Sequence, residues 1–450
     1  MKHKITRVAI ALVVLLVLPL VAWRVYLSLV INKQLAKIRA AGLPANGEEL
    51  NHWYAAVSES QNAALVLTQA FALRRDYSDS RSNLINDFKL PKRGEALAPE
   101  QIELLKGYLA LNEARLKKAD QALTLPASRY PIDYTMLMNT LLPHLAWLDD
   151  IAELHQYAAL IEMDSGSTLS GATNIVTMLA LARTLDNEPC LISQYVRLKI
   201  FGRAFTTLER RMSAGLLDAS EIRSLTEAFR QTTITNMTAL ALIGDRAMFI
   251  PYFRMTRAEN ARLNSRNAGE EPKTDSPLPC HGPAILRLIG YYELDFGTFL
   301  IGMSKAITAS SNAPPKNLRA SAYFARVGEE STKRRRVLSG LIFSNYANSW
   351  RRENEGVAQL WLALTALAIE HFHNDTNKFP ESLEELVPGY LGEVPEDPFT
   401  GIELEYRRTE KGYLLYSVGP DREDNGGLEK TDKKQSEDKQ SYDITFTVER

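Results

Sequence analysis

Oxygen-bearing side chains follow the second of three predicted C-terminal strands at the spacing of a cation site. Asp421, Glu423 and Asn425 stand at every second position, and Gly426 follows them. A hard cation such as Ca²⁺ collects oxygen ligands from a tight turn of this kind. The spacing therefore predicts a structural calcium loop, with an unoccupied polar loop as the alternative. A strand precedes the loop and no helical pattern follows it, so a helix–loop–helix calcium site is excluded.

Two pairs of histidines are the other candidates for metal or acid–base chemistry. His371 and His373 are two positions apart on a predicted helix. Their side chains would point about 200° apart, so they cannot share a metal. His144 and His155 are eleven positions apart and fall on one helix face, with acidic residues between them. We interpret both pairs as structural, and a site at the second pair is the alternative.

The chain lacks the common motifs of nucleophilic and nucleotide chemistry. It has no Gly-x-Ser-x-Gly, no phosphate loop and no dinucleotide fingerprint. Its two cysteines, Cys190 and Cys280, form no Cys-x-x-Cys pair, so no structural zinc site is predicted. They are two separate residues or, in an oxidising compartment, a single bridge. We predict a non-catalytic protein, and the alternative is a hydrolase-like enzyme with its site in the helical region.

Length and charge limit the architecture and the partners. A chain of 450 residues is expected to form two or three domains. The net charge of -1 gives no reason to expect nucleic acid as a partner. The basic run Lys333 to Arg336 lacks interleaved aromatic residues, so we interpret it as a solvated helix face rather than an anion-binding patch.

The N-terminal 31 residues indicate the compartment. Lys2, Lys4 and Arg7 precede an apolar run that continues to residue 31 and is interrupted only by Arg24. This length suffices to cross a bilayer, and no small-residue cleavage site follows the apolar run. We predict that residues 1–31 are an uncleaved, single-pass transmembrane signal anchor in the inner membrane. The basic tail is then cytoplasmic, and the bulk of the chain is periplasmic.

The predicted fold is mainly α. Residues 32–350 are expected to form an α-helical hairpin domain, because apolar residues recur every three or four positions with short connections between the runs. Residues 259–283 are rich in Pro, Gly and Asn and are predicted to be a loop. The helices of this domain are expected at residues 98–123, 134–164, 168–186, 189–214, 219–232, 284–308 and 316–350.

Residues 351–450 are predicted to form a compact α+β domain. An amphipathic helix begins near Glu353 and ends near Asn377. After it, apolar and polar residues alternate over residues 402–407 and 442–448, which is the period of half-buried strands, and a second strand is expected between them at residues 413–418. One long helix followed by a small antiparallel sheet is the expected arrangement.

The order of motifs in this C-terminal domain resembles the soluble domain of the type II secretion major pseudopilin. The motifs are Phe379-Pro380, Leu383 and Leu386, the stretches 395–406 and 416–421, and Asp443-Ile444. The resemblance implies a calcium ion held by the Val418 carbonyl and by Asp421 and Asp443. It also implies partners among other envelope or secretion proteins. It covers about residues 353–448.

The N-terminus departs from the pseudopilin pattern. Residues 1–31 contain no acidic residue and no Gly-Phe-x-x-x-Glu step. The whole arrangement, including Gly42-Leu43-Pro44 before Glu49-Leu50-Asn51 and Asn62-Ala63-Ala64, also resembles uncharacterised membrane-anchored proteins of planctomycete-type bacteria, a likeness that supplies no activity. We therefore predict a membrane-anchored envelope scaffold or adaptor protein with a pseudopilin-like C-terminal domain. A divergent minor pseudopilin is a further alternative.

Overall fold

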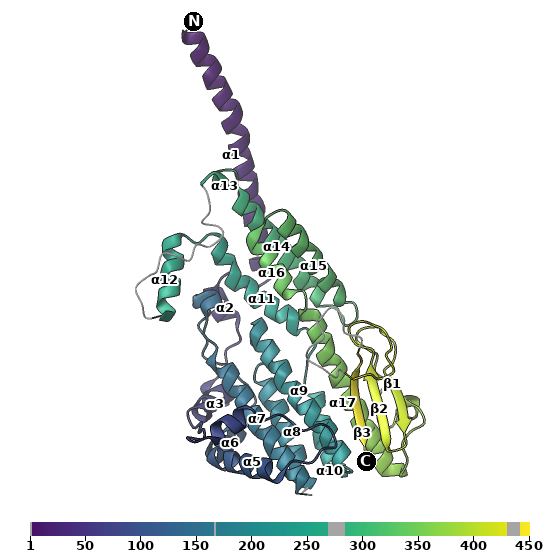
Figure 1. Ribbon diagram of the computed structural model, residues 1–450. Helices are drawn as coiled ribbons and strands as arrows, with labels where there is room; N and C mark the ends of the chain where they lie inside the picture. Colours follow the sequence, from purple (N-terminus) through teal and green to yellow (C-terminus); the bar gives the residue numbers. More distant parts are fainter. Residues whose placement is uncertain (1, 166–167, 269–283, 430–441) are drawn as a thin grey trace.

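The computed structural model describes residues 2–165, 168–268, 284–429 and 442–450. It is mainly helical, with one three-stranded antiparallel sheet, so the predicted fold class is confirmed at this level. Figure 1 shows a long helix projecting from a helical body, with the sheet on the flank of that body. The helices are α1 (Lys2–Ala40), α2 (Gly47–Trp53), α3 (Ala63–Phe71), α4 (Arg81–Asn86), α5 (Pro99–Leu111), α6 (Glu113–Ala122), α7 (Pro143–Asp164), α8 (Thr168–Arg183), α9 (Leu191–Ala214), α10 (Ala219–Arg230), α11 (Met237–Phe249), α12 (Arg257–Ala268), α13 (Ala284–Leu288), α14 (Tyr291–Ser310), α15 (Leu318–Lys333), α16 (Val337–Tyr346) and α17 (Ser349–Thr376).

The first helix, α1, has two different halves. Its C-terminal half packs into the body, where Ile31, Leu35 and Ile38 join a cluster formed mainly with α14 and α16. Its N-terminal half stands away from the body (Figure 1). Among the described residues, no helix has a stretch that is long and apolar enough to cross a bilayer.

The largest hydrophobic cluster joins the helical region to the C-terminal sheet. It contains buried residues of α7 to α10, most of the inner face of α17, and Tyr413, Leu415 and Phe446 from the sheet. Phe205 of α9 meets Phe446 edge to face, with 5.3 Å between the ring centroids. The sheet is therefore packed against α9 as well as against α17.

The sheet is a meander of β1 (Glu405–Thr409), β2 (Gly412–Ser417) and β3 (Ile444–Glu449), in that order. Both neighbouring pairs of strands are antiparallel, as expected for a small meander. Helix α9 covers the outer edge of β3, because the Glu209 carboxylate accepts the Thr447 N–H at 2.7 Å and the Ser213 hydroxyl donates to the Thr447 carbonyl at 3.3 Å. Covering an edge in this way satisfies backbone groups that would otherwise face solvent.

Several predicted helix boundaries were wrong. Residues 98–123 form two helices, because the buried Asn112 bonds to both the backbone N–H and the carbonyl of Arg75 and interrupts the helix there. Residues 134–164 form a 3₁₀ turn followed by α7, which starts at Pro143. The expected continuous segments 284–308 and 316–350 are also divided, each into shorter helices.

The loop prediction for residues 259–283 was wrong in its first part. Residues 257–268 are helical in α12, which Thr256 and Glu259 stabilise by reciprocal N-terminal hydrogen bonds. Residues 269–283, including Cys280, lie outside the described part of the chain. The Cys190–Cys280 bridge therefore stays a prediction, and Cys190 is buried at the start of α9.

Two helical glycines provide a matched pair for testing the packing of the body. A Cβ at Gly244 of α11 would lie 1.8 Å from the Pro189 carbonyl oxygen, whereas a Cβ at Gly202 of α9 would meet nothing within 4 Å. We expect Gly244→Ala to lower the free energy of unfolding by about 1–3 kcal/mol through overpacking. Gly202→Ala should raise it by about 0.5–1 kcal/mol. Urea unfolding measures both changes, and equal effects would contradict the close approach of α11 to residue 189.

Candidate functional site

The loop after β2 holds together through the residues predicted to bind calcium. The Asp421 carboxylate accepts the Glu423 N–H at 3.2 Å and the Asn425 side-chain amide at 3.2 Å. The Asn425 amide also donates to the Glu423 carbonyl at 2.9 Å. Asp421 and Asn425 are therefore adjacent, and Glu423 takes part in these bonds through its backbone.

Asp443, just before β3, lies against the other side of this loop. Its carboxylate accepts the Asn425 N–H at 3.3 Å and the Gly427 N–H at 2.6 Å, and the side chain is buried. Burial raises its pKa, and the nearby Asp424 carboxylate raises the pKa further. Asp424 was not among the predicted ligands, although it lies within the same run of polar residues.

Calcium fits the chemistry of this loop. Asp421 and Asp443 bring carboxylate oxygens to Asn425 in one turn, and the N–H groups of Asn425 and Gly427 hold the buried Asp443 carboxylate there. A cation would balance this carboxylate and Asp424. Within the described residues, no three His, Cys, Asp or Glu side chains group closely enough to bind a metal by themselves. The site would therefore need Asn425 and backbone carbonyls as ligands.

Asp397 anchors the strand end that precedes the loop. Its buried carboxylate accepts the N–H of Val418 at 2.9 Å and the N–H of Phe399 at 2.7 Å. These bonds fix the backbone at Val418, whose carbonyl is the predicted backbone ligand. Asp397 was not predicted as a site residue, although it belongs to the Pro395-Glu396-Asp397-Pro398 motif that carries part of the pseudopilin resemblance.

The two histidine pairs do not form shared sites. His371 packs edge-on against Tyr390 at 5.0 Å between centroids, and His373 packs against Phe379 at 4.6 Å. His144 bonds to the buried Glu188 carboxylate at 3.0 Å. His155 instead donates its Nδ1–H to the Asn174 side-chain oxygen at 2.9 Å. Each ring thus has its own structural partner.

A buried polar cluster lies at the junction of α7, α9, α11 and α16. Glu188 contacts both His144 and the Ser193 hydroxyl, the latter at 2.5 Å. Nearby, Asp245 accepts the Tyr346 hydroxyl at 2.5 Å. All five side chains are buried. Such converging titratable groups would favour an enzyme if they faced a cleft, but burial denies a substrate access to them.

Asp245 makes folding stability depend on pH. Burial raises its pKa to about 7. The unfolded carboxyl releases its proton near pH 4, so the folded state holds more protons between about pH 4 and pH 7, and stability falls as pH rises through this range. Between these pH values, the free energy of unfolding of the wild type should fall by up to about 1.4 kcal/mol per pH unit relative to that of Asp245→Asn. Urea unfolding at pH 5, 6 and 7 checks the slope, and parallel pH profiles for the two proteins would refute it.

A cavity of about 1080 Å³ lies between α10, α17 and residues 389–398. Its floor is apolar and comes largely from α17, where Trp361 is partly exposed beside Leu364 and Ala368. Tyr390 and Val394 line the opposite wall. We call this cavity the α10–α17 groove. Apolar concavities of this size are the usual binding sites of proteins.

The rim of the α10–α17 groove carries both signs of charge. Arg223 and Arg230 are exposed on α10, with Glu227 between them. Glu393 and Glu396 line the facing segment. A molecule bound in the groove would therefore contact an apolar floor and charged groups of both signs on its rim.

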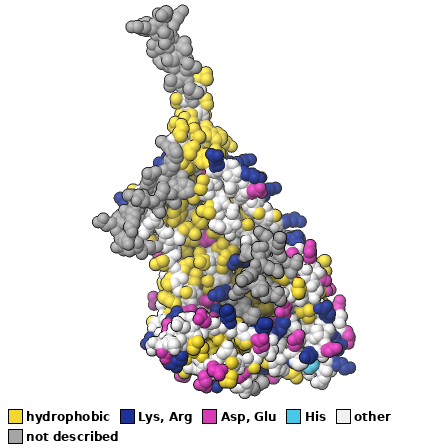
Figure 2. Space-filling model, in the orientation of Figure 1, with side chains coloured by type: hydrophobic (Ala, Val, Ile, Leu, Met, Phe, Trp, Pro, Cys, Tyr) yellow, Lys and Arg dark blue, Asp and Glu magenta, His cyan; other side chains and the backbone are white. Residues whose placement is uncertain are grey.

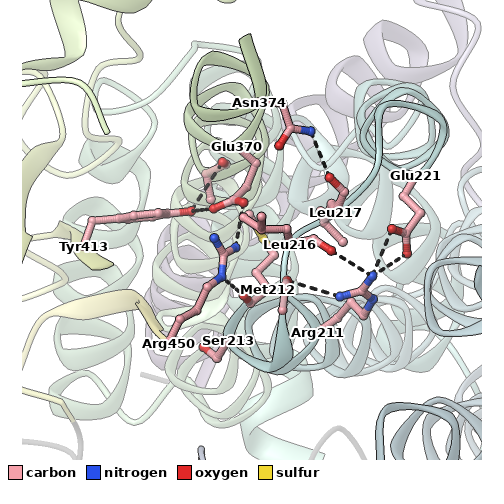
Figure 3. A network of polar contacts seen from close by, with 12 residues as sticks. Arg211, Met212, Ser213, Leu216, Leu217, Glu221, Glu370, Asn374, Tyr413 and Arg450 are labelled. Carbon is pink, nitrogen blue, oxygen red and sulfur yellow. Dashed lines mark hydrogen bonds and ion pairs between the residues drawn. The ribbon is translucent and has the colours of Figure 1, made fainter. Parts of the chain in front are cut away.

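Two ion pairs, each with a buried carboxylate, connect α9 to α10 and to α17 beside this groove (Figure 3). Arg211 of α9 donates to both carboxylate oxygens of Glu221 on α10, at 2.8 and 2.9 Å, and both residues are buried. Arg450 bonds to the buried Glu370 of α17 at 2.6 Å and to the Met212 carbonyl of α9 at 2.7 Å. The wall and floor of the groove are thus tied to the same helix, α9.

The pseudopilin resemblance of residues 353–448 rests on sequence motifs. The observed order, a long helix followed by a three-stranded meander, is the order predicted from the periodicity of the sequence. Comparison with family models, with curated proteins and with solved structures finds no match for this chain.

Proposed function

We propose that this protein is a membrane-anchored scaffold or adaptor of the cell envelope that holds a segment of a partner protein in the α10–α17 groove. The bulk of the chain would be periplasmic, and α1 would tether it to the inner membrane. The observation that carries the binding role is the groove itself, with an apolar floor and charges on both rims. A secretion-related partner is the proposal that the pseudopilin resemblance adds.

The projecting half of α1 supports the anchor. Its large apolar side chains are exposed instead of packed against the body, among them Val14, Leu15, Val17 and Leu18. We call this projecting half of α1 the neck. In Figure 2 the described part of the neck is dominated by hydrophobic surface. Contiguous apolar surface of this kind marks a contact with lipid or protein.

The dimensions and chemistry of the groove favour a peptide segment as its occupant. Its volume is at the upper end of the range for small-ligand sites, so it can accept several side chains at once. Half-buried aromatic residues such as Trp361 and Tyr390 are typical anchors at protein interfaces. The nearby titratable groups lie on the rim, where they can select charge but are not held together for catalysis.

Photo-crosslinking in intact cells tests this proposal. A photoreactive amino acid replaces Tyr390 in the groove wall, and the control carries it at the exposed Leu111, the last residue of α5. We expect one discrete protein adduct from position 390 and none from position 111. Mass spectrometry then identifies the partner. The same adducts from both positions, or none from position 390, would contradict the proposed binding site.

The proposed calcium ion would stabilise the loop between β2 and β3. At a hundredfold excess over its dissociation constant, a single bound ion adds about 2.7 kcal/mol to the free energy of unfolding. We expect the full chain to be this much more stable in calcium than in chelator. Asp421→Asn should abolish the difference but leave stability in chelator nearly unchanged, because Asp421 is only partly buried. Identical unfolding of the wild type in both buffers would eliminate the calcium proposal.

A further inference from the structure

Helix α13 exposes apolar side chains close to the base of the neck. Ile285 is 59% exposed, Leu288 is 56% exposed, and the following Ile289 is 43% exposed. Trp23 and Tyr26 of α1, which stack at 5.8 Å between centroids, are also exposed. Two segments far apart in the sequence therefore present apolar surface at one end of the body (Figure 1).

Specific contacts fix α13 at this level of α1. The Trp23 indole N–H donates to the Ile289 carbonyl at 3.0 Å. Arg24 donates to the Arg287 carbonyl at 2.7 Å and forms an ion pair with Glu293 at 2.6 Å. The turn between α13 and α14 needs Gly290, whose φ is +78° and whose added Cβ would lie 2.5 Å from Leu27. The position of the apolar face relative to the neck is thus built into the fold.

The basic run that we interpreted as a solvated helix face lies at the same end. Residues 334–336 connect α15 to α16 and contact the start of α14, where Tyr291 donates to the Arg335 carbonyl and Arg336 to the Thr298 hydroxyl. Lys333, Arg334 and Arg335 are exposed. Figure 2 shows Lys and Arg side chains on the shoulder of the body beside the neck.

We propose that this end of the body, made of residues 285–289 and 333–335 around Trp23, rests on the surface of an anionic bilayer. The inference rests on the proposed membrane anchor. Exposed aliphatic residues beside Trp and Tyr suit the interfacial layer of a membrane, and adjacent Lys and Arg suit phosphate head groups. The body would then be held at a fixed height and orientation by two contacts, the α1 anchor and this basic, apolar collar.

Depth-dependent quenching tests the proposal with the full chain in vesicles. An environment-sensitive fluorophore is attached at Leu288→Cys in a Cys280→Ser background, in which the remaining Cys190 is buried. The control carries the label at Leu111→Cys in α5, a helix at the opposite end of the body (Figure 1). In vesicles containing phosphatidylglycerol, a nitroxide-labelled lipid should quench the label at 288 several-fold more than the label at 111. Changing Lys333, Arg334 and Arg335 together to Glu should abolish the excess quenching.

The possible results distinguish a failure of the proposed membrane anchor from a failure of the proposed bilayer contact at residues 285–289 and 333–335. Failure of the unlabelled full chain to float with the vesicles would overturn the anchor. Flotation with equal, weak quenching at both labels would overturn only the collar. A blue-shifted label at 288 that lipid does not quench would mean that protein, such as a second copy, covers the face, and would also overturn it. Retained quenching in the triple Glu variant would overturn the role of the basic residues.

Discussion

Replacing Arg450 by methionine is expected to lower the free energy of unfolding by about 3–5 kcal/mol. Arg450 is the cationic partner of Glu370, which is fully buried in α17 and also accepts the Tyr413 hydroxyl at 3.2 Å. Removal of the guanidinium leaves a buried carboxylate without compensation and detaches the end of β3 from the Met212 carbonyl. Urea unfolding of the full chain measures the loss.

A double-mutant cycle isolates the Arg450–Glu370 pair. Adding Glu370→Gln to Arg450→Met removes the uncompensated charge, so the double variant should be more stable than the Arg450→Met variant alone. The coupling energy is the difference between the double variant and the sum of the single variants. Strictly additive effects would mean that the two side chains do not interact as the structure describes.

Replacing Arg211 by methionine should cost about the same, 3–5 kcal/mol, for the same reason. Glu221 is 4% exposed, and one of its oxygens also accepts the Asp218 N–H in the capping box of α10. The matched control is Arg81→Met, which removes an exposed pair with Asp79 and should cost far less than Arg211→Met. Equal losses from the buried and exposed replacements would show that Arg211 and Glu221 are not buried together.

The second effect of Arg211→Met should appear at the groove. Arg211 holds α10 to α9, and α10 forms one wall of the α10–α17 groove. We therefore expect hydrogen exchange of α10 to accelerate more in this variant than exchange of α7. Uniform acceleration across both helices would indicate global destabilisation without a special role for the pair.

Local periodicity predicted those elements whose stability depends on one buried face. The inner face of α17 and the three strands are read directly from the sequence, and both were found. All residues of β2 are buried, so this strand is not half-buried. The division at Asn112 could not be found this way, because its cause is a bond to Arg75, which is distant in the sequence. The contacts of Glu209 and Ser213 with β3 could not be predicted either, because they also join residues that are distant in the sequence.

For the candidate sites too, the sequence did not predict which distant residues come together. The family resemblance proposed Asp421 and Asp443 together, and the structure brings both to Asn425. By contrast, the α10–α17 groove joins residues 219–235 to residues 389–398, and the one motif noted there, at residues 395–398, gives no sign that the two segments meet. The basic run at residues 333–336 was visible in the sequence, but its place beside α1 depends on how α14 and α16 pack. Sequence patterns identified the residues, and tertiary packing determined which of them meet.

The most direct test of the binding role is Ala368→Trp, which places a large ring on the groove floor. Ala114→Trp is the control, since it adds the same ring to an exposed position of α6. With the photoreactive group at position 390, we expect Ala368→Trp to reduce the partner adduct at least about tenfold, equivalent to about 1.4 kcal/mol of binding free energy. Ala114→Trp should leave the adduct unchanged. An undiminished adduct in a folded Ala368→Trp variant would show that the partner does not occupy the groove.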